Sequence, residues 1–220
     1  MTAQRRAGES LMRDLQRAVA QSFPVLDEDA QRVSLAIYRT LARGRPVDLD
    51  ALAEAPGLPP VEAICSLVEG WPAVYRDGSG AVIGYWGMAL GGTGHRIEVA
   101  GVELATWCAW DTLFLPSILG TEVLVDSPCP VSGQRIRLRL SPAGIHDARP
   151  AEPVLSFLDP SDKIGDGVIS SFCHHIHFFV DRATADSWAV DRPDALILSL
   201  EQGWRLAEAL NLARYPRLRG

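Results

Sequence analysis

The chain has 220 residues, of which 47% are hydrophobic and 22% are charged, a composition typical of a globular protein that buries a substantial core. Its net charge of -6 at pH 7 argues against nucleic acid or an anionic membrane surface as a partner. The N-terminus lacks the apolar stretch of a signal peptide, and no run approaches the roughly 18 apolar residues of a membrane span. We therefore expect a cytoplasmic protein with no membrane partner.

The first 90 residues predict a helical module. Apolar residues recur at helical spacing over residues 8–22 and 30–43, and Asp48 is a suitable N-cap for a short helix that follows. Another helix is expected over residues 60–69, and after it two short strands around an Asp-Gly-Ser-Gly turn. This order of elements outlines a winged-helix-like module.

The expected recognition helix of this module does not favour DNA. Residues 60–69 contain Glu62 and Glu69 and neither lysine nor arginine. Such a helix repels phosphate groups instead of neutralising them. We therefore expect no nucleic acid partner.

From residue 91 onward the pattern changes to that of strands. These are expected over residues 95–104, 122–127, 134–141, 154–158, 168–180 and 195–200. In residues 134–141 apolar residues alternate with arginines, which predicts one buried and one solvated face. A helix near Thr106 and a closing helix over residues 200–215 flank the strands. The predicted fold class is α+β: an N-terminal winged-helix-like helical module (residues 1–90), then a mixed or antiparallel-sheet domain with flanking helices (residues 91–220).

The stretch TWCAWDTLF places Cys108 and Asp111 three residues apart, so on a helix they share a face. Neighbours such as Trp107 and Trp110 make that face poor in water. Burial raises the pKa of a carboxyl group and lets it act as a general acid near neutral pH. A structural interpretation competes, in which Asp111 begins a helix and Cys108 is a small core residue. This stretch alone favours the structural interpretation.

The stretch SSFCHHIHFF is the second candidate. On a strand, Cys173, His175 and His177 point to one face and His174 to the other. Thiolate and imidazole are proper zinc ligands, but the spacing matches no standard zinc motif. Histidines stacked in the core, or supporting other residues, are the better interpretation of His175 and His177.

Two further cysteines lie outside these motifs. Four scattered cysteines in a reducing compartment argue against a disulfide framework. Cys65 lies in the middle of an expected helix and is most simply a core residue. Cys129 lies in a loop between two prolines, with no acid or base beside it.

Taken together, these segments resemble the alkylmercury lyase family. The resemblance rests on WCAWDTLFLPSILG (residues 107–120) and SFCHHIHFF (residues 171–179), with weaker support from VSG after Cys129 and from the N-terminal module. It extends over about residues 25–215. The combination of Trp-Cys-x-x-Asp with Ser-Phe-Cys, whose cysteines are 65 positions apart (173 minus 108), is specific, whereas either half alone is weak.

The family performs its reaction with two cysteines and one aspartate, which correspond here to Cys108, Cys173 and Asp111. The resemblance therefore implies an enzyme of mercury detoxification that cleaves the carbon–mercury bond of an organomercurial by protonolysis, giving a hydrocarbon and Hg(II). Thiolate is the softest ligand that a protein carries, and mercury is a very soft ion. The same three residues are therefore expected to contact the mercury of substrate and product.

The resemblance also implies that no organic cofactor or resident metal takes part, that low-molecular-weight thiols assist turnover, and that a mercuric reductase accepts the Hg(II). Cys129 corresponds to an additional, mainly structural cysteine of the family. Many members carry a second cysteine where this chain has His174. Strand alternation places that position opposite Cys173, so we expect no effect on catalysis.

Two other functions are weighed against the lyase. A thiol-based, mercury- or metal-sensing winged-helix regulator predicts a basic recognition surface, which Glu62 and Glu69 contradict. A cysteine hydrolase with Cys108 as nucleophile and a histidine such as His175 as base leaves Cys173 without a role.

Overall fold

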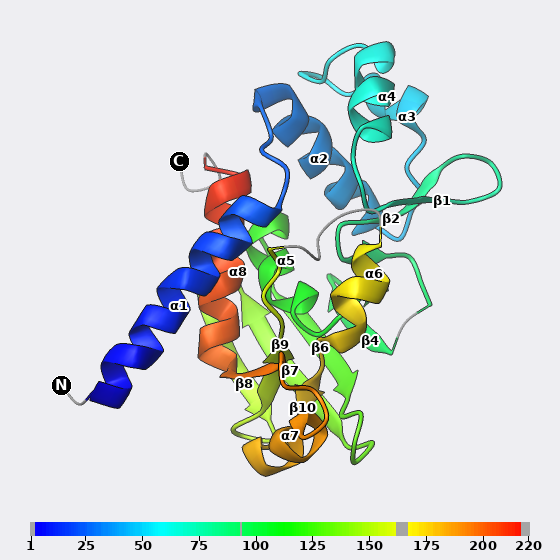
Figure 1. Ribbon diagram of the computed structural model, residues 1–220. Coiled ribbons are helices and arrows are strands. Elements are labelled where there is room, and N and C mark those ends of the chain that lie inside the picture. The colour runs from blue at the N-terminus through cyan, green and yellow to red at the C-terminus, as the bar shows by residue number, and fades with distance from the viewer. Residues whose placement is uncertain (1–2, 93, 162–166, 217–220) are drawn as a thin grey trace.

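The computed structural model describes residues 3–92, 94–161 and 167–216 of the chain. Within these ranges, helices and two antiparallel sheets share one hydrophobic core (Figure 1). The fold is therefore a mixed α+β fold with antiparallel sheets, as the sequence predicts. No helix among the described residues is long and apolar enough to cross a bilayer.

The N-terminal helices form close to their predicted positions. They are α1 (Ala3–Ser22), α2 (Glu28–Leu41), α3 (Leu49–Ala53) and α4 (Val61–Glu69). The Asp48 side chain caps α3 by accepting a hydrogen bond from the Asp50 N–H at 3.0 Å. After α4, β1 (Val74–Arg76) and β2 (Val82–Tyr85) make the predicted antiparallel hairpin.

The larger sheet has eight strands in the order β1-β2-β3-β5-β4-β6-β7-β8, and all neighbours are antiparallel. Its other strands are β3 (Met88–Ala89), β4 (His95–Val99), β5 (Val102–Thr106), β6 (Val123–Pro128), β7 (Arg135–Ser141) and β8 (Gly144–Arg149). β3 pairs with β5, so the N-terminal hairpin continues directly into the sheet of the second half of the chain. The division of the chain at residue 90 stays a prediction.

The predicted alternation in β7 is confirmed. Ile136, Leu138 and Leu140 are buried, and the arginines between them are exposed. The apolar face of the sheet therefore points into the core and the arginines point to solvent.

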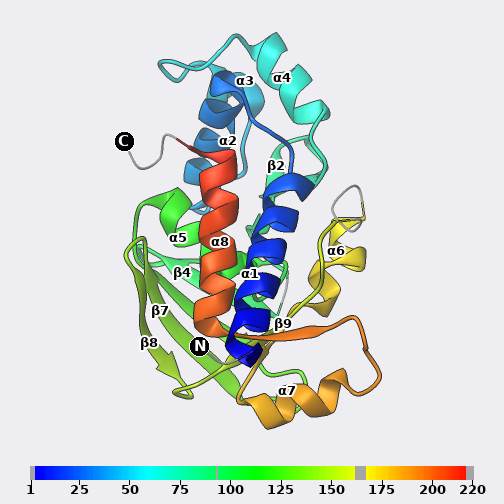
Figure 2. The same ribbon diagram turned by 60° about the vertical axis from the view of Figure 1, so that its left-hand side comes forward.

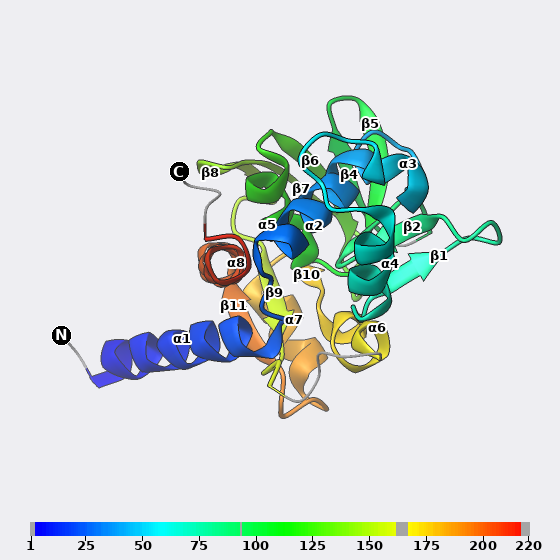
Figure 3. The ribbon, with the colours of Figure 1, turned by 90° about the horizontal axis from the view of Figure 1, so that it is seen from above.

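Helix α5 (Asp111–Leu119) lies in the core between this sheet and α8 (Leu200–Arg214). Figure 2 shows α8 beside α1, and in the view from above α8 is seen end-on next to α5 (Figure 3). The smaller sheet has the order β10-β9-β11, with β9 (Val154–Phe157), β10 (Phe178–Phe179) and β11 (Leu196–Ser199). Helix α7 (Arg182–Ala189) packs on this sheet.

Several predicted elements are wrong in detail. Residues 95–104 form a hairpin, β4 and β5, and not one strand. Ala100 and Gly101 have positive φ values of 49° and 82° and make a two-residue turn inside a run of alternating residues. The helix expected near Thr106 begins at Asp111, and Thr106 ends β5. Strand β8 and helix α7 were not predicted.

The strand predicted over residues 168–180 is also wrong. This segment forms α6 (Val168–Ser171), a 3-10 turn (Cys173–His175) and only then the short β10. Local strand preference is overridden because the turn hydrogen-bonds to other parts of the chain. Cys173, His175 and His177 therefore do not alternate on one face of a strand.

Candidate active site

Cys108 lies in the loop between β5 and α5, and Asp111 is the first residue of α5. The Thr106 hydroxyl donates a hydrogen bond to the Cys108 carbonyl at 3.0 Å. The Thr112 hydroxyl donates to the Ala109 carbonyl at 2.7 Å. Side chains on both sides of the loop therefore fix its backbone.

Cys173 lies in the turn that follows α6. Ser156 of β9 holds this turn, because its hydroxyl donates to the His175 carbonyl at 2.7 Å and accepts from the His177 N–H at 2.9 Å. The N–H of Ala109 donates to the Ile176 carbonyl at 3.2 Å, which joins the turn to the loop of Cys108. Two segments far apart in sequence are thus joined by a backbone hydrogen bond.

The result is a compact group of three side chains. The sulfur atoms of Cys108 and Cys173 and a carboxylate oxygen of Asp111 all lie within 4.8 Å of one another. The exposed fractions of these residues are 0%, 4% and 5%. The three residues that the sequence singles out therefore come together in a site that is almost closed to solvent.

Burial shifts the pKa of the Asp111 carboxyl group. It raises the pKa of the Asp111 carboxyl from 3.8 to about 7, against the opposing effect of hydrogen bonds from Cys108 and the backbone N–H of Trp107. One of these bonds, from the Cys108 N–H to Oδ2 of Asp111, is 2.8 Å long. At neutral pH the carboxyl group can therefore take up a proton or release one.

Burial also acts on the thiols. It raises the pKa of Cys108 well above 9.0, and a hydrogen bond that its thiol donates to Cys173 raises it further. For Cys173 that same hydrogen bond lowers the pKa, but burial and the nearby Asp111 outweigh it and the pKa is still raised. Both thiols are therefore neutral at pH 7, and a base is needed to accept a proton when sulfur binds a metal.

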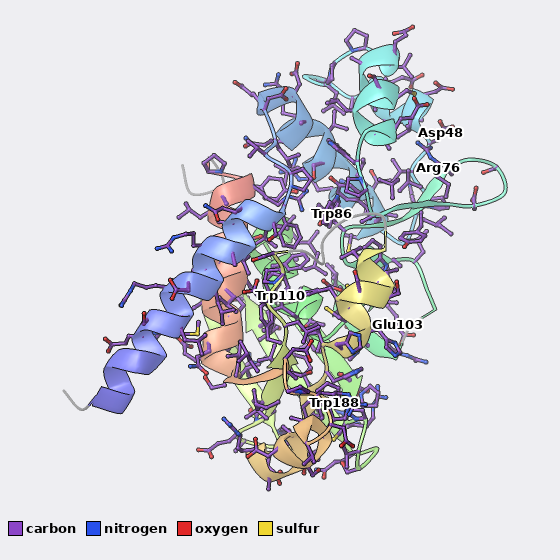
Figure 4. The ribbon with its side chains drawn as sticks, in the orientation of Figure 1. Asp48, Arg76, Trp86, Glu103, Trp110 and Trp188 are labelled. Carbon is purple, nitrogen blue, oxygen red and sulfur yellow. The ribbon has the colours of Figure 1, made fainter. Side chains whose placement is uncertain are left out.

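The aromatic residues next to Cys108 and Asp111 in the sequence are buried. Trp107 and Trp110 are buried, and the ring of Trp110 packs edge-on against Phe157 and Phe114 at centroid distances of 5.2 Å and 5.5 Å. The indole N–H of Trp110 donates to the Gly203 carbonyl at 3.1 Å. Figure 4 shows Trp110 in the middle of the molecule, near α5 and α8. These tryptophans give the acid the apolar surroundings that the sequence predicts.

Two residues from the segment β1 to β3 also lie close to the site, and the sequence interpretation missed both. Tyr75 of β1 is 41% exposed, and its ring lies edge-on to Trp107 at 5.2 Å. Burial raises the pKa of Tyr75, and its proximity to Cys173 raises it further. Gly87, in the turn between β2 and β3, lies against Asp111.

The remaining histidines of the second motif do not join the group. His177 is half-buried, and its ring stacks on His95 at 6.2 Å and lies edge-on to Trp188 at 5.6 Å. His174 is exposed, and its ring lies 5.4 Å from that of His175. Among the described residues, the cluster suited to a metal is Cys108, Asp111 and Cys173, and no zinc site forms with His175 and His177.

The other two cysteines lie apart from the cluster. Cys65 is partly buried in α4, as expected for a residue that packs against the core. Cys129 follows β6 and is buried, with its N–H donating to the Gln134 carbonyl at 2.9 Å.

Known proteins resemble this chain in sequence and in fold. Alkylmercury lyase from Staphylococcus epidermidis is 35% identical over 179 residues, which cover 81% of each chain. Alkylmercury lyase from Pseudomonas putida is 34% identical over 183 residues, covering 83% of this chain and 84% of that protein. The crystal structure of the mercury-bound form of MerB2 has the same fold, with a TM-score of 0.74 and 20% identity over 90% of this chain and 98% of that one.

A family model supports the same assignment. The model for MerB, described as alkylmercury lyase, matches residues 88–211 and so includes the segments that carry Cys108, Asp111 and Cys173. With this match and a relative at 35% identity over four fifths of the chain, the chain belongs to the alkylmercury lyase family.

Proposed function

We propose that the protein is an organomercurial lyase that cleaves the carbon–mercury bond of R–Hg–X by protonolysis, giving R–H and Hg(II), and that Cys108, Cys173 and Asp111 carry the reaction. One observation carries this proposal: two thiols and a carboxyl group with a pKa of about 7 lie within 4.8 Å of one another in a buried site. Two soft sulfur ligands suit mercury, and the carboxyl group suits proton transfer to carbon.

The first thiol binds mercury and displaces X, and its proton leaves with X as HX. The second thiol then transfers its proton to the Asp111 carboxylate and adds to mercury. A third ligand weakens the carbon–mercury bond by increasing the electron density on carbon. Asp111 delivers its proton to that carbon as the bond breaks. The net reaction is R–Hg–X plus two thiols to R–H, HX and mercury held by two sulfur atoms.

The surroundings support this sequence of steps. Both thiols are neutral before mercury binds, so a nearby base is required, and Asp111 is the carboxyl group within reach in the cluster. We propose that Trp107 and Trp110, which flank Cys108 and Asp111 in the sequence and are buried, limit access of water to the acid.

The proposed activity is tested by incubating the purified, reduced protein with methylmercury or phenylmercury and an excess of a small thiol. Methane or benzene is then measured by gas chromatography. We expect hydrocarbon in proportion to enzyme. A folded, reduced protein that releases none would contradict the lyase proposal.

The alternative of a mercury-sensing winged-helix regulator has less support. We propose that residues 25–90 form a winged-helix-like module, because α2, α3, α4 and the β1–β2 hairpin follow one another in the expected order. Yet Glu62 and Glu69 are both exposed on α4, and such a helix does not suit DNA.

Further expectations about the protein's setting are part of the same proposal. We expect it to work in the cytoplasm without an organic cofactor or resident metal, and with low-molecular-weight thiols that release Hg(II). A mercuric reductase is the proposed acceptor of the Hg(II), and nucleic acid is not an expected partner.

A further inference from the structure

The β2–β3 hairpin turns on two residues, Trp86 and Gly87, because Tyr85 pairs directly with Met88. Both turn residues have positive φ, 36° at Trp86 and 88° at Gly87. This is the pattern of a type I′ turn, in which glycine is favoured at the second position. Backbone geometry alone therefore explains a glycine at position 87.

The space around Gly87 adds a second requirement. A Cβ atom built on Gly87 would lie 2.6 Å from both Cγ and Oδ1 of Asp111 and 2.9 Å from its Cβ. Real Cβ atoms essentially never lie this close to a non-bonded atom. The turn thus touches the carboxyl group of the proposed acid on the Oδ1 side, while the Cys108 N–H holds Oδ2 at 2.8 Å.

The turn itself is firmly held. The Gly87 carbonyl accepts a hydrogen bond from the Trp107 N–H at 3.2 Å, and the Trp86 carbonyl accepts one from the Tyr38 hydroxyl at 2.8 Å. The Trp86 ring packs against Phe23 at 5.2 Å. Figure 4 shows Trp86 in the interior, above Trp110. A side chain added at position 87 would therefore displace the Asp111 carboxyl more readily than the turn.

We propose that Gly87 is a positioning residue for Asp111: its missing side chain leaves the space in which the carboxyl group is held between the turn and the Cys108 N–H. The inference rests on the proposed function, because it takes Asp111 as the proton donor. It gives the β2–β3 hairpin a task in catalysis, since its turn lies against the carboxyl group of the acid. Gly87 itself transfers no proton and binds no mercury.

A matched control exists in the same sheet. The β4–β5 hairpin also turns on two residues with positive φ, Ala100 and Gly101, and Gly101 has a φ of 82°. A Cβ atom built on Gly101 meets nothing within 4 Å. Gly101→Ala therefore introduces the same kind of backbone strain as Gly87→Ala without touching the active site.

The first test compares kcat and KM for hydrocarbon release by the unaltered protein, Gly87→Ala and Gly101→Ala. We expect Gly87→Ala to lower kcat by roughly tenfold to a hundredfold with little change in KM, because a displacement of about 1 Å in a catalytic group costs this much. Gly101→Ala should keep both constants. Equal kcat values in the two variants would overturn the proposal, whereas a lack of hydrocarbon from the unaltered protein would overturn the proposed function instead.

A second test does not depend on activity. Urea unfolding is measured for Gly87→Ala and Gly101→Ala, each with and without Asp111→Gly, which removes the side chain that the new methyl group would meet. We expect Gly87→Ala to lower the urea midpoint of unfolding more than Gly101→Ala does. This extra loss should disappear when both substitutions are made in a protein that also carries Asp111→Gly. If Gly87→Ala alone does not fold, folding of its double variant supports the proposal. An extra loss that persists, or a double variant that also fails to fold, overturns it.

Discussion

Oδ2 of Asp111 accepts a hydrogen bond from the backbone N–H of Cys108 at 2.8 Å, so one short turn fixes both the acid and one of the two cysteines. The second thiol, Cys173, comes from a different segment, which Ser156 and the Ala109 N–H hold in place. Because a backbone N–H helps to orient the acid, a side chain that keeps this bond but carries no acidic proton can separate proton transfer from mercury binding.

Asp111→Asn is expected to bind the organomercurial and fail to cleave it. The amide oxygen can still accept the Cys108 N–H, so the loop should keep its conformation, but an amide has no proton to give to carbon at neutral pH. We expect hydrocarbon release to fall by about 10²- to 10⁴-fold, the usual contribution of a general acid. Mercury that stays with the protein through gel filtration measures binding. Hydrocarbon release at the normal rate would show that Asp111 is not the acid.

Cys108→Ser and Cys173→Ser are each expected to abolish turnover, because a hydroxyl group is a poor ligand for a soft ion and both sulfur atoms are needed to weaken the carbon–mercury bond. The measurement is hydrocarbon released per enzyme with phenylmercury and excess thiol. Cys65→Ser, in α4 and outside the cluster, is the control and should retain its kcat. Full activity in Cys173→Ser would refute a mechanism with two thiolates.

Cys129→Ser is expected to affect stability and not catalysis. The side chain is 1% exposed, and serine places a more polar group at this buried position. The free energy of unfolding should fall by about 1 to 3 kcal/mol. Urea unfolding measures the change, and kcat of the folded fraction should match that of the unaltered protein. A loss of kcat without a loss of stability would give Cys129 a part in the reaction.

Local sequence patterns predicted the parts of the fold that depend on alternation of apolar residues and on helix capping. Alternation in residues 134–141 gave both the strand and its buried face, and Asp48 marked the start of α3. The site residues followed from two motifs 65 positions apart (173 minus 108) and from their resemblance to a family. Judged from its own stretch of sequence, Cys108 could simply be a buried core cysteine. Its proximity to Asp111 and Cys173 is what distinguishes it from a core residue.

Tertiary contacts decide what local patterns missed. The segment 168–180 is rich in apolar residues and favours a strand. The carbonyl groups of His175 and Ile176, however, accept hydrogen bonds from the Ser156 hydroxyl and the Ala109 N–H, and the chain turns at Cys173. Gly87 reads as an ordinary turn glycine, because nothing in the sequence indicates that Asp111, 24 positions later (111 minus 87), lies against it.

The raised pKa of Asp111 predicts that the proposed acid makes the fold less stable at neutral and alkaline pH. The folded state holds this proton up to a pKa of about 7 and the unfolded chain only to about 3.8, so stability falls as the pH rises from 4 to 7. Asp111→Asn removes this effect. Its free energy of unfolding should exceed that of the unaltered protein at pH 8 by up to about 4 kcal/mol, with little difference near pH 4. Equal urea midpoints at both pH values would contradict the raised pKa.

His95 predicts the opposite dependence on pH. Its ring is 8% exposed, its Nδ1 lies 2.7 Å from the Ser127 hydroxyl, and burial followed by repulsion from His177 lowers its pKa from 6.5 to about 4. The unfolded chain therefore binds this proton more readily, and stability is lost as the pH falls from 6.5 towards 4. His95→Asn keeps a hydrogen-bonding atom near Nδ1 and cannot be protonated. Between pH 7 and pH 4.5 it should lose less stability than the unaltered protein, by about 1 to 3 kcal/mol in urea unfolding. If the variant loses as much stability as the unaltered protein over this range, the buried ring of His95 is not what makes the fold sensitive to acid.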